Sequence, residues 1–218
     1  MIMNKETAIQ AARFLLQIKA IKLNNENPFT WASGRKSPIY CDNRVTLSHP
    51  EIRTFLRQQF VAIVNELFAD VDVIAGVATG GIPQGVLVAQ DLGKPFVYVR
   101  PSEKAHGLQN KIEGDIKEGQ TVVVIEDLVS TGKSSLQAVE ALRANGCQVK
   151  GMAAIFTYNL DVAKQAFEQA GVNLSTITDY HTLIDLAAEE NFIRAEDLES
   201  LGEWRKNPEA WSEKRMNG

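Results

Sequence analysis

Apolar residues follow a helical period in two segments of the first third of the chain. The first stripe runs over residues 8–23, with Lys19 as its only interruption and Asn4 placed to cap the start. The second stripe runs over residues 52–67. Residues 48–51 spell a capping box in front of it, with a proline in the first turn. Both segments are predicted to form amphipathic helices that pack on a core.

From residue 71 the pattern changes to short apolar runs that alternate with helical stripes. Such alternation predicts βαβ units and therefore an α/β fold with an open, mostly parallel sheet flanked by helices. The charged, Trp-containing residues 202–218 are expected to form a peripheral tail. The expected strands are residues 71–78, 95–100, 122–125, 151–158 and 174–177, and the expected helices are residues 82–92, 136–145, 162–170 and 179–190.

Length, charge and cysteine content narrow the class of protein. A chain of 218 residues is most simply one domain, residues 1–218, with room for a single large core. The net charge of −4 argues against an extended nucleic-acid footprint, and no segment resembles a membrane span or an export leader. Cys41 and Cys147 lie far apart and form no C-x-x-C pattern, so neither a disulfide framework nor a zinc site is expected. These features favour a cytoplasmic location without nucleic-acid or membrane partners.

The segment TVVVIEDLVSTGKSS, residues 121–135, combines a buried strand with polar chemistry. Its β-branched run is typical of a strand covered on both faces, and we expect the burial to stop at Glu126 and Asp127. A turn of small residues then opens a helix. Backbone N–H groups at a helix start have no intrahelical partner, and Gly132 lets the backbone approach an oxygen closely. This segment therefore predicts a phosphate site.

The two carboxylates indicate which kind of phosphate ligand would fit. A phosphate would be repelled by Glu126 and Asp127 at short range, so their partners are expected to be hydroxyls or a metal ion. A sugar phosphate offers a phosphate for the turn and hydroxyls for the carboxylates. The alternative is an ordinary βα turn in which the acidic pair is solvated. A nucleotide P-loop is excluded because Asp127 stands where G-x-x-x-x-G-K-[ST] needs glycine, and the glycines near Gly76 do not form G-x-G-x-x-G.

A long polar connection, residues 101–120, precedes this segment. It carries Lys104, His106 and Lys111, with Arg100 at its edge. Long connections of this kind are usually functional or disordered, and a solvated surface loop is the simpler reading. A cationic loop beside an anion site could instead close over a charged leaving group.

Three segments together resemble an orotate phosphoribosyltransferase of the type I phosphoribosyltransferase family. VVVIEDLVSTGKSS resembles the phosphoribosyl diphosphate signature, FTWASGRKSPIYCDNR the orotate-recognition segment, and VRPSEKAHGLQNKIEG the flexible catalytic loop. The resemblance covers roughly residues 5–190. It implies a core of about residues 50–180 and a small hood, mainly from about residues 1–45 and C-terminal elements. The implied reaction is Mg²⁺-dependent transfer of ribose 5-phosphate from 5-phospho-α-D-ribose 1-diphosphate (PRPP) to N1 of orotate, giving orotidine 5′-phosphate and diphosphate in pyrimidine biosynthesis.

The same resemblance assigns roles to individual residues. Glu126 and Asp127 would hold the ribose hydroxyls, while Arg100, Lys104 and His106 would be catalytic and contact the diphosphate. The loop would reach into a neighbouring subunit's site, which implies a homodimer. Mg²⁺ would be held mainly by substrate and water, near the two acids. The PRPP-binding set is Arg100, Lys104, His106, Glu126, Asp127, Leu128, Val129, Ser130, Thr131, Gly132, Lys133 and Ser134, with Thr79, Gly80 and Gly81 near the diphosphate. The orotate-binding set is Ser130, Ile39, Tyr40 and Arg44.

Some cations common in the family are absent. Many relatives carry lysine where this chain has Ala32, Gly80 and Pro101, and an arginine that some relatives use near Tyr158 is missing. Arg44 is a hypothetical substitute for reading the orotate carboxylate. Arg35, Lys36 and Lys133 are the other candidates for the missing charge contacts.

Two rival functions remain open at this point. A purine-type phosphoribosyltransferase would share the signature but not the orotate-recognition segment. A non-catalytic regulator that senses PRPP would carry a DNA-binding extension and need not keep Lys104 and His106.

Overall fold

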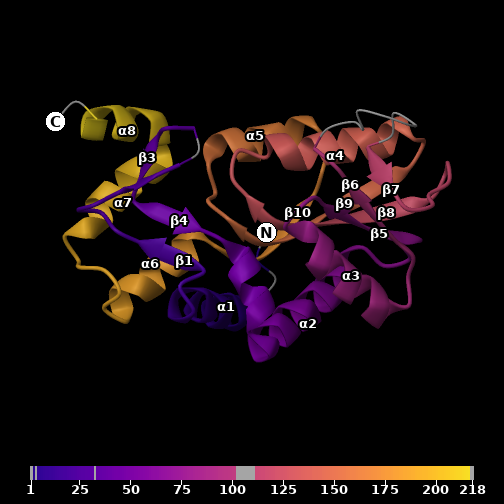
Figure 1. Ribbon diagram of the computed structural model, residues 1–218, viewed down its shortest axis with the longest axis horizontal. Coiled ribbons are helices and arrows are strands. Elements are labelled where there is room, and N and C mark those ends of the chain that lie inside the picture. Colours follow the sequence, from indigo (N-terminus) through magenta and orange to yellow (C-terminus); the bar gives the residue numbers. More distant parts are fainter. Residues whose placement is uncertain (1, 3, 32, 102–110, 217–218) are drawn as a thin grey trace.

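A six-stranded sheet forms the centre of the molecule in the computed structural model, which describes residues 2, 4–31, 33–101 and 111–216 (Figure 1). The strand order is β10-β9-β8-β5-β6-β7, and all neighbours are parallel except β6 and β7. This arrangement confirms the predicted α/β class. The strands are β5 Val73–Val77, β6 Phe96–Val99, β7 Ile112–Glu113, β8 Thr121–Val129, β9 Gln148–Thr157 and β10 Leu174–Asp179.

Helices cover both faces of this sheet (Figure 1). Side chains of one strand alternate between the faces: in β8, Val122 and Val124 belong to the core under α4 and α5, whereas Val123 and Ile125 belong to the core shared with α1, α2 and α3. Burial on both faces explains why β5 and residues 122–125 of β8 read as uninterrupted apolar runs. The helices are α1 Lys5–Gln17, α2 Pro50–Leu67, α3 Gly81–Leu92, α4 Lys133–Ala144, α5 Asp161–Gln169 and α6 Tyr180–Glu189.

A smaller group of elements, which we call the hood, lies beside the sheet on the left of Figure 1. It contains two antiparallel strand pairs, β1 with β4 and β2 with β3, together with the two C-terminal helices. Residues 29–44 contribute three of the four short strands. The hood consists of β1 Ile21–Leu23, β2 Phe29–Thr30, β3 Lys36–Ser37, β4 Ile39–Cys41, α7 Asp197–Lys206 and α8 Pro208–Met216, and the 3-10 helix η1 Asn43–Ser48 connects it to α2.

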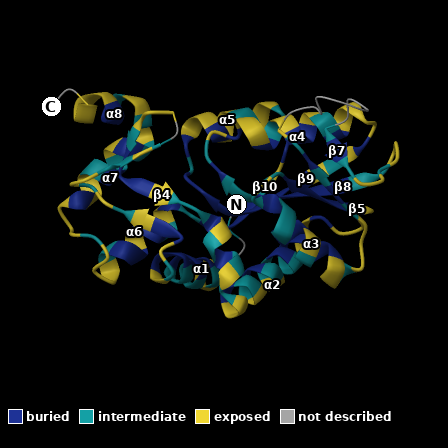
Figure 2. Ribbon diagram, in the orientation of Figure 1, coloured by how far each residue is buried: buried dark blue, intermediate teal, exposed yellow. Residues whose placement is uncertain are grey.

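The expected peripheral tail is wrong, because residues 202–216 lie in packed helices. Trp204 is 0% exposed and Trp211 is 3% exposed, and both belong to the main core. Figure 2 shows buried, dark-blue stretches on α7 and α8. Trp204 lies 5.9 Å from Trp31 of the β2–β3 connection and 5.4 Å from Tyr158 at the end of β9, measured between ring centroids. The last helices therefore fix the hood against the carboxyl end of the sheet.

Two helix boundaries near the N-terminus also differ from prediction. Asn4 caps α1 as expected, with its side chain accepting from the backbone N–H of Thr7 at 3.0 Å. The helix nevertheless ends at Gln17, and the last predicted residue of the stripe, Leu23, lies in β1. The capping box before α2 does not form: His49 is the N-cap and makes no side-chain cap hydrogen bond. Within the described part of the chain, no helix is long and apolar enough to cross a membrane.

Candidate functional site

A cavity of about 580 Å³ opens at the carboxyl ends of β5 and β8. Ligands of open α/β sheets bind at this edge, where the loops that follow parallel strands converge. The signature segment supplies about half of the wall, and the β5–α3 connection and residues after β4 supply the rest. The lining residues are Cys41, Asp42, Arg44, Val77, Ala78, Thr79, Gly80, Glu126, Asp127, Leu128, Ser130, Thr131, Gly132, Lys133, Ser134 and Gln137.

The acid pair stands on an extension of β8. The predicted end of burial at Glu126 is wrong: β8 continues to Val129 and Glu126 is only 4% exposed. Its carboxylate accepts from the backbone N–H of Asp127 at 3.0 Å and from the hydroxyl of Ser135 at 2.9 Å. Burial, followed by the neighbouring Asp127 carboxylate, raises the pKa of Glu126 well above its ordinary value. Glu126 is thus a buried, hydrogen-bonded acid, whereas Asp127 is half-buried in the cavity wall.

Two helix N-termini meet the cavity on either side of this acid pair. Helix α4 begins after Gly132, whose φ of +81° suits glycine, and α3 begins after Gly80; neither helix start has a side-chain cap. The first N–H groups of α4 are therefore available to an anion, which is what a phosphate site at residues 130–134 would need. The start of α3 offers fewer donors, because the Ile82 N–H donates to the Thr79 carbonyl at 3.3 Å and Pro83 has no N–H. The cavity consequently offers two anion-binding ends with carboxylates between them.

The β5–α3 connection packs closely on the acid-bearing strand. A Cβ atom added to Gly80 would lie 2.2 Å from Cγ of Asp127, and one added to Gly81 would lie 2.3 Å from the carbonyl oxygen of Ile125. The peptide bond between Ala78 and Thr79 is cis. The absence of a side chain at Gly80 and Gly81 thus lets this connection lie directly against the end of β8.

The predicted PRPP-binding residues are only partly gathered here. Leu128 and residues 130–134 line the cavity, but the side chain of Val129 is buried in the core under α4 and α5. Arg100 lies outside the lining, with its guanidinium 3.4 Å from Glu113. Lys104 and His106 fall outside the described residues.

The predicted orotate-binding residues occupy the hood side. Ile39 and Tyr40 lie in β4, paired with β1, and neither lines the cavity. The carbonyl of Ile39 accepts from the indole N–H of Trp31 at 3.2 Å. Arg44 does line the cavity, but it binds Asp42 through two hydrogen bonds of 2.6 and 2.9 Å, which lower the pKa of Asp42. The guanidinium of Arg44 is therefore paired in this structure.

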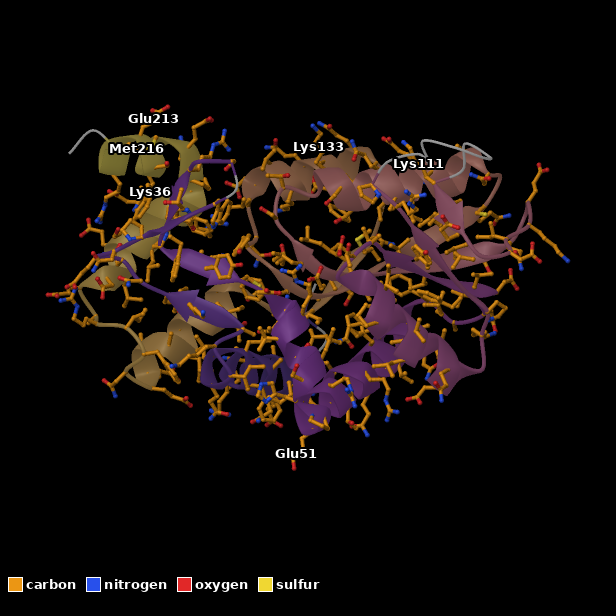
Figure 3. The ribbon with its side chains drawn as sticks, viewed as in Figure 1. Lys36, Glu51, Lys111, Lys133, Glu213 and Met216 are labelled. Atoms are coloured by element: carbon orange, nitrogen blue, oxygen red, sulfur yellow. The ribbon has the colours of Figure 1, made fainter. Side chains whose placement is uncertain are left out.

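The other candidate cations lie on different elements. Lys36 projects from β3 of the hood and Lys133 from the start of α4, both along the upper side of the view in Figure 3. Lys133 lines the cavity, whereas Lys36 donates to the hydroxyl of Thr30 at 3.0 Å. Arg35 pairs with Glu209 of α8. Of these three cations, Lys133 alone lines the acid-pair cavity.

Several residues at the site escaped the sequence reasoning. Cys41, the last residue of β4, and Asp42, directly after it, line the cavity, and Gln137 reaches it from the second turn of α4. Ser135, which hydrogen-bonds Glu126, stands one position beyond the predicted PRPP-binding residues. The polar residues at the end of the short segment YCDNR were a usable signal for the first two residues. Ser135 lay in the predicted turn of small residues but was given no role, and Gln137 read as an ordinary helix position.

The described residues contain no group of three or more His, Cys, Asp or Glu side chains that could hold a metal ion by themselves. Carboxylate oxygens are ligands that suit Mg²⁺, but both oxygens of Glu126 already accept hydrogen bonds. The donor set fits an ion held largely by substrate oxygens and water, with the half-buried carboxylate of Asp127 beside it. This is the mode in which Mg²⁺ usually accompanies phosphorylated substrates.

Comparison with known proteins gives a consistent family. Residues 48–177 match the model of the phosphoribosyl transferase domain. The chain is 58% identical over 200 residues to an orotate phosphoribosyltransferase of Phocaeicola vulgatus, covering 92% of this chain and 94% of the relative. It is 54% identical to that of Listeria monocytogenes, covering 93% and 97%.

The fold agrees with this relationship. The crystal structure of orotate phosphoribosyltransferase from Aeropyrum pernix superimposes with a TM-score of 0.72 at 30% identity, covering 84% of this chain and 99% of that one. A match over 200 of the 218 residues extends beyond residues 48–177 on both sides, so it includes the hood strands β1 to β4. The chain therefore belongs to the phosphoribosyltransferase family, and within it to the orotate phosphoribosyltransferases.

Proposed function

We propose that this protein transfers ribose 5-phosphate from PRPP to N1 of orotate, with release of diphosphate, in pyrimidine biosynthesis. The observation that carries the proposal is the placement of an acid pair between two uncapped helix N-termini in one cavity. PRPP has the matching order of groups: a 5′-phosphate, two ribose hydroxyls and a diphosphate. The relatives at 54–58% identity bear the name of this activity.

The cavity residues divide between the parts of PRPP. The N–H groups and hydroxyls of residues 130–134 take the 5′-phosphate, and residues 79–81 at the start of α3 face the diphosphate. Asp127 accepts the ribose hydroxyls. Glu126, whose pKa is raised by burial and by the Asp127 carboxylate, positions its neighbour through the Asp127 N–H and supplies a polar wall. The buried Glu126 thus fixes the position of the half-buried Asp127 rather than competing with it for the ribose hydroxyls.

Catalysis follows from where charge develops. As N1 of orotate attacks, the bond from C1 to the diphosphate breaks, so positive charge builds on the ribose and negative charge on the leaving group. Arg100, Lys104 and His106 are proposed to stabilise the leaving group, because fixed cations act where negative charge forms. The Asp127 carboxylate favours the cationic ribose. Mg²⁺, when bound to the substrate, supplies further charge neutralisation at the diphosphate.

The proposal also covers the assembly, the orotate-binding residues and the cellular location. Lys104 and His106 are proposed to enter the site of a partner subunit, which makes the protein a homodimer with shared sites. Ile39, Tyr40, Ser130 and Arg44 are proposed to surround orotate, with Arg44 exchanging Asp42 for the substrate carboxylate. The two cysteines are unpaired thiols, which fits the cytoplasmic location that we propose.

One assay tests the activity directly. The protein is mixed with Mg²⁺, PRPP and orotate, and the loss of orotate absorbance is followed, with purine bases in parallel reactions. Loss of orotate absorbance that depends on PRPP is expected. Turnover of a purine base without orotate turnover would indicate the purine-type enzyme, and PRPP binding without turnover of any base would indicate a sensing protein.

A further inference from the structure

The acid pair stands where β8 loses its neighbour. The ladder between β5 and β8 ends at the pair Gly76 and Ile125, while β8 runs on to Val129 alongside β9. Strand β5 turns away after Val77 into the connection that leads to α3. Glu126 and Asp127 therefore lie beyond the end of the β5 ladder, and β5 is one of the two strands that hold the rest of β8 in place.

A buried asparagine holds this extension from outside the sheet. The side-chain amide of Asn43, in η1, donates to the backbone carbonyl of Asp127 at 2.6 Å, and the residue is 1% exposed. This contact does not come from a strand of the sheet, because η1 follows directly on β4 of the hood. Asn43 lies 84 residues before Asp127 in the chain. Asn43 thus links the hood to the residue that faces the ribose hydroxyls.

Asn43 is itself fixed by its surroundings. Its side-chain oxygen accepts from the thiol of Cys41 at 3.3 Å, and its backbone carbonyl accepts from the hydroxyl of Thr46 at 2.6 Å. That hydroxyl in turn accepts from the side-chain amide of Gln84 in α3 at 3.4 Å, and both Thr46 and Gln84 are buried. The amide of Asn43 therefore has one available orientation, toward β8.

We propose that Asn43 is a positioning residue for the transferase reaction: it sets the position of the Asp127 carboxylate and makes that position depend on the placement of hood strand β4. The proposal rests on the proposed function of the cavity. A group that fixes the position of reacting partners affects the reaction rate, because a displacement of those partners by about 1 Å can lower the rate about 100-fold. The contact is made through the backbone of Asp127, so the effect of Asn43 should be carried by the carboxylate of that residue.

The test compares two asparagines of the hood region. Asn43→Leu removes the amide that holds β8. Asn25→Leu is the matched control, because Asn25 donates to Asp197 at 2.9 Å and ties the β1–β2 connection to α7 within the hood, without contacting the cavity. We expect Asn43→Leu to lower kcat/KM for PRPP by about 10- to 100-fold while KM for orotate changes by less than about threefold. Asn25→Leu should change each constant by less than about threefold.

A second pair of variants keeps the test decisive if Asn43→Leu does not fold. Asn43→Asp keeps the size of the side chain but replaces the donor with an acceptor. PRPP affinity is measured for Asn43→Asp, for Asp127→Asn and for the double variant. The loss from Asn43→Asp should fall below about threefold when Asp127 is already changed, because contacting residues are coupled in such a cycle.

Three results would overturn the proposal: kinetics of both Asn43 variants within about threefold of the parent, equal losses in Asn25→Leu, or full additivity with Asp127→Asn. Failure of the parent protein to turn over orotate would instead count against the proposed function. In that case the PRPP-binding cycle still decides whether Asn43 positions Asp127.

Discussion

Replacement of Gly81 by alanine should damage both stability and the candidate site. Alanine favours a helix over glycine by about 0.8–1 kcal/mol, so an increase in stability would be expected at an open position of α3. At Gly81 the new Cβ would lie 2.3 Å from the carbonyl oxygen of Ile125, whereas a carbon and an oxygen in contact stay about 3.3 Å apart. The start of α3 must therefore move about 1 Å away from β8. Because the obstacle is backbone, no side-chain rotation relieves it.

Overpacking of this kind costs about 1–3 kcal/mol, so we expect Gly81→Ala to lower the free energy of unfolding by that amount. The same movement separates residues 79–81 from the acid pair and should lower kcat/KM for PRPP by about 100-fold. Gly202→Ala in α7 is the control, because nothing lies within 4 Å of its added Cβ. It should stabilise the protein by about 0.5–1 kcal/mol and leave kinetics unchanged. Urea unfolding at one protein concentration measures all three proteins; a Gly81→Ala variant as stable as the parent would refute the reasoning.

Three further outcomes follow from the contacts described above. Because burial and Asp127 raise the pKa of Glu126, the folded protein holds that proton more tightly than the unfolded chain does, and stability falls as pH rises above the ordinary glutamate pKa of about 4.3. Glu126→Gln removes this loss, so its stability relative to the parent in urea unfolding should increase from about pH 4.3 upward; a constant difference across pH would contradict the assignment. Trp204→Ala should lower the free energy of unfolding by about 3–5 kcal/mol, because it leaves a cavity. Trp204→Phe should lower it by less than about 1.5 kcal/mol, since the buried indole N–H has no hydrogen-bond partner in the described part of the chain. Equal losses in thermal or urea unfolding would disprove this. Lys104→Ala should lower turnover far more than it weakens PRPP binding. Lys117→Ala is the control, because Lys117 is exposed. Equal losses of turnover in kinetics and of affinity in direct titration would exclude a transition-state contact.

The central sheet was predictable because its signals are local. Strands β5, β8 and β9 are buried on both faces, so each appears as an apolar run in the sequence itself. The phosphate-binding turn was predictable for the same reason: the strand, the small residues and the helix start are consecutive. The boundaries were less accurate at β8, where the carboxylates looked like the end of a strand that continues through them.

The burial of Glu126 could not be read from its neighbours in sequence. A charged side chain ordinarily marks a strand end, since an unpaired carboxylate is costly to bury. Here the hydroxyl of Ser135 lies nine positions later and reaches the carboxylate because α4 folds back over β8. The cost of burial is offset by that hydrogen bond, by the Asp127 N–H and by the preference for the protonated form. Each of these depends on the fold being present.

The C-terminal helices illustrate the same limit at larger scale. Residues 202–216 contain only two tryptophans among mostly polar and charged side chains, too few for a helical stripe. Trp204 is nevertheless fully buried, because its partners Trp31 and Tyr158 come from segments that are distant in sequence and meet only at the carboxyl edge of the sheet. Asn43 and Asp127 are brought together at that edge in the same way. The contacts that local patterns missed are therefore tertiary ones: Asn43, next to the hood, holds the backbone of Asp127, and Ser135 of α4 holds the carboxylate of Glu126.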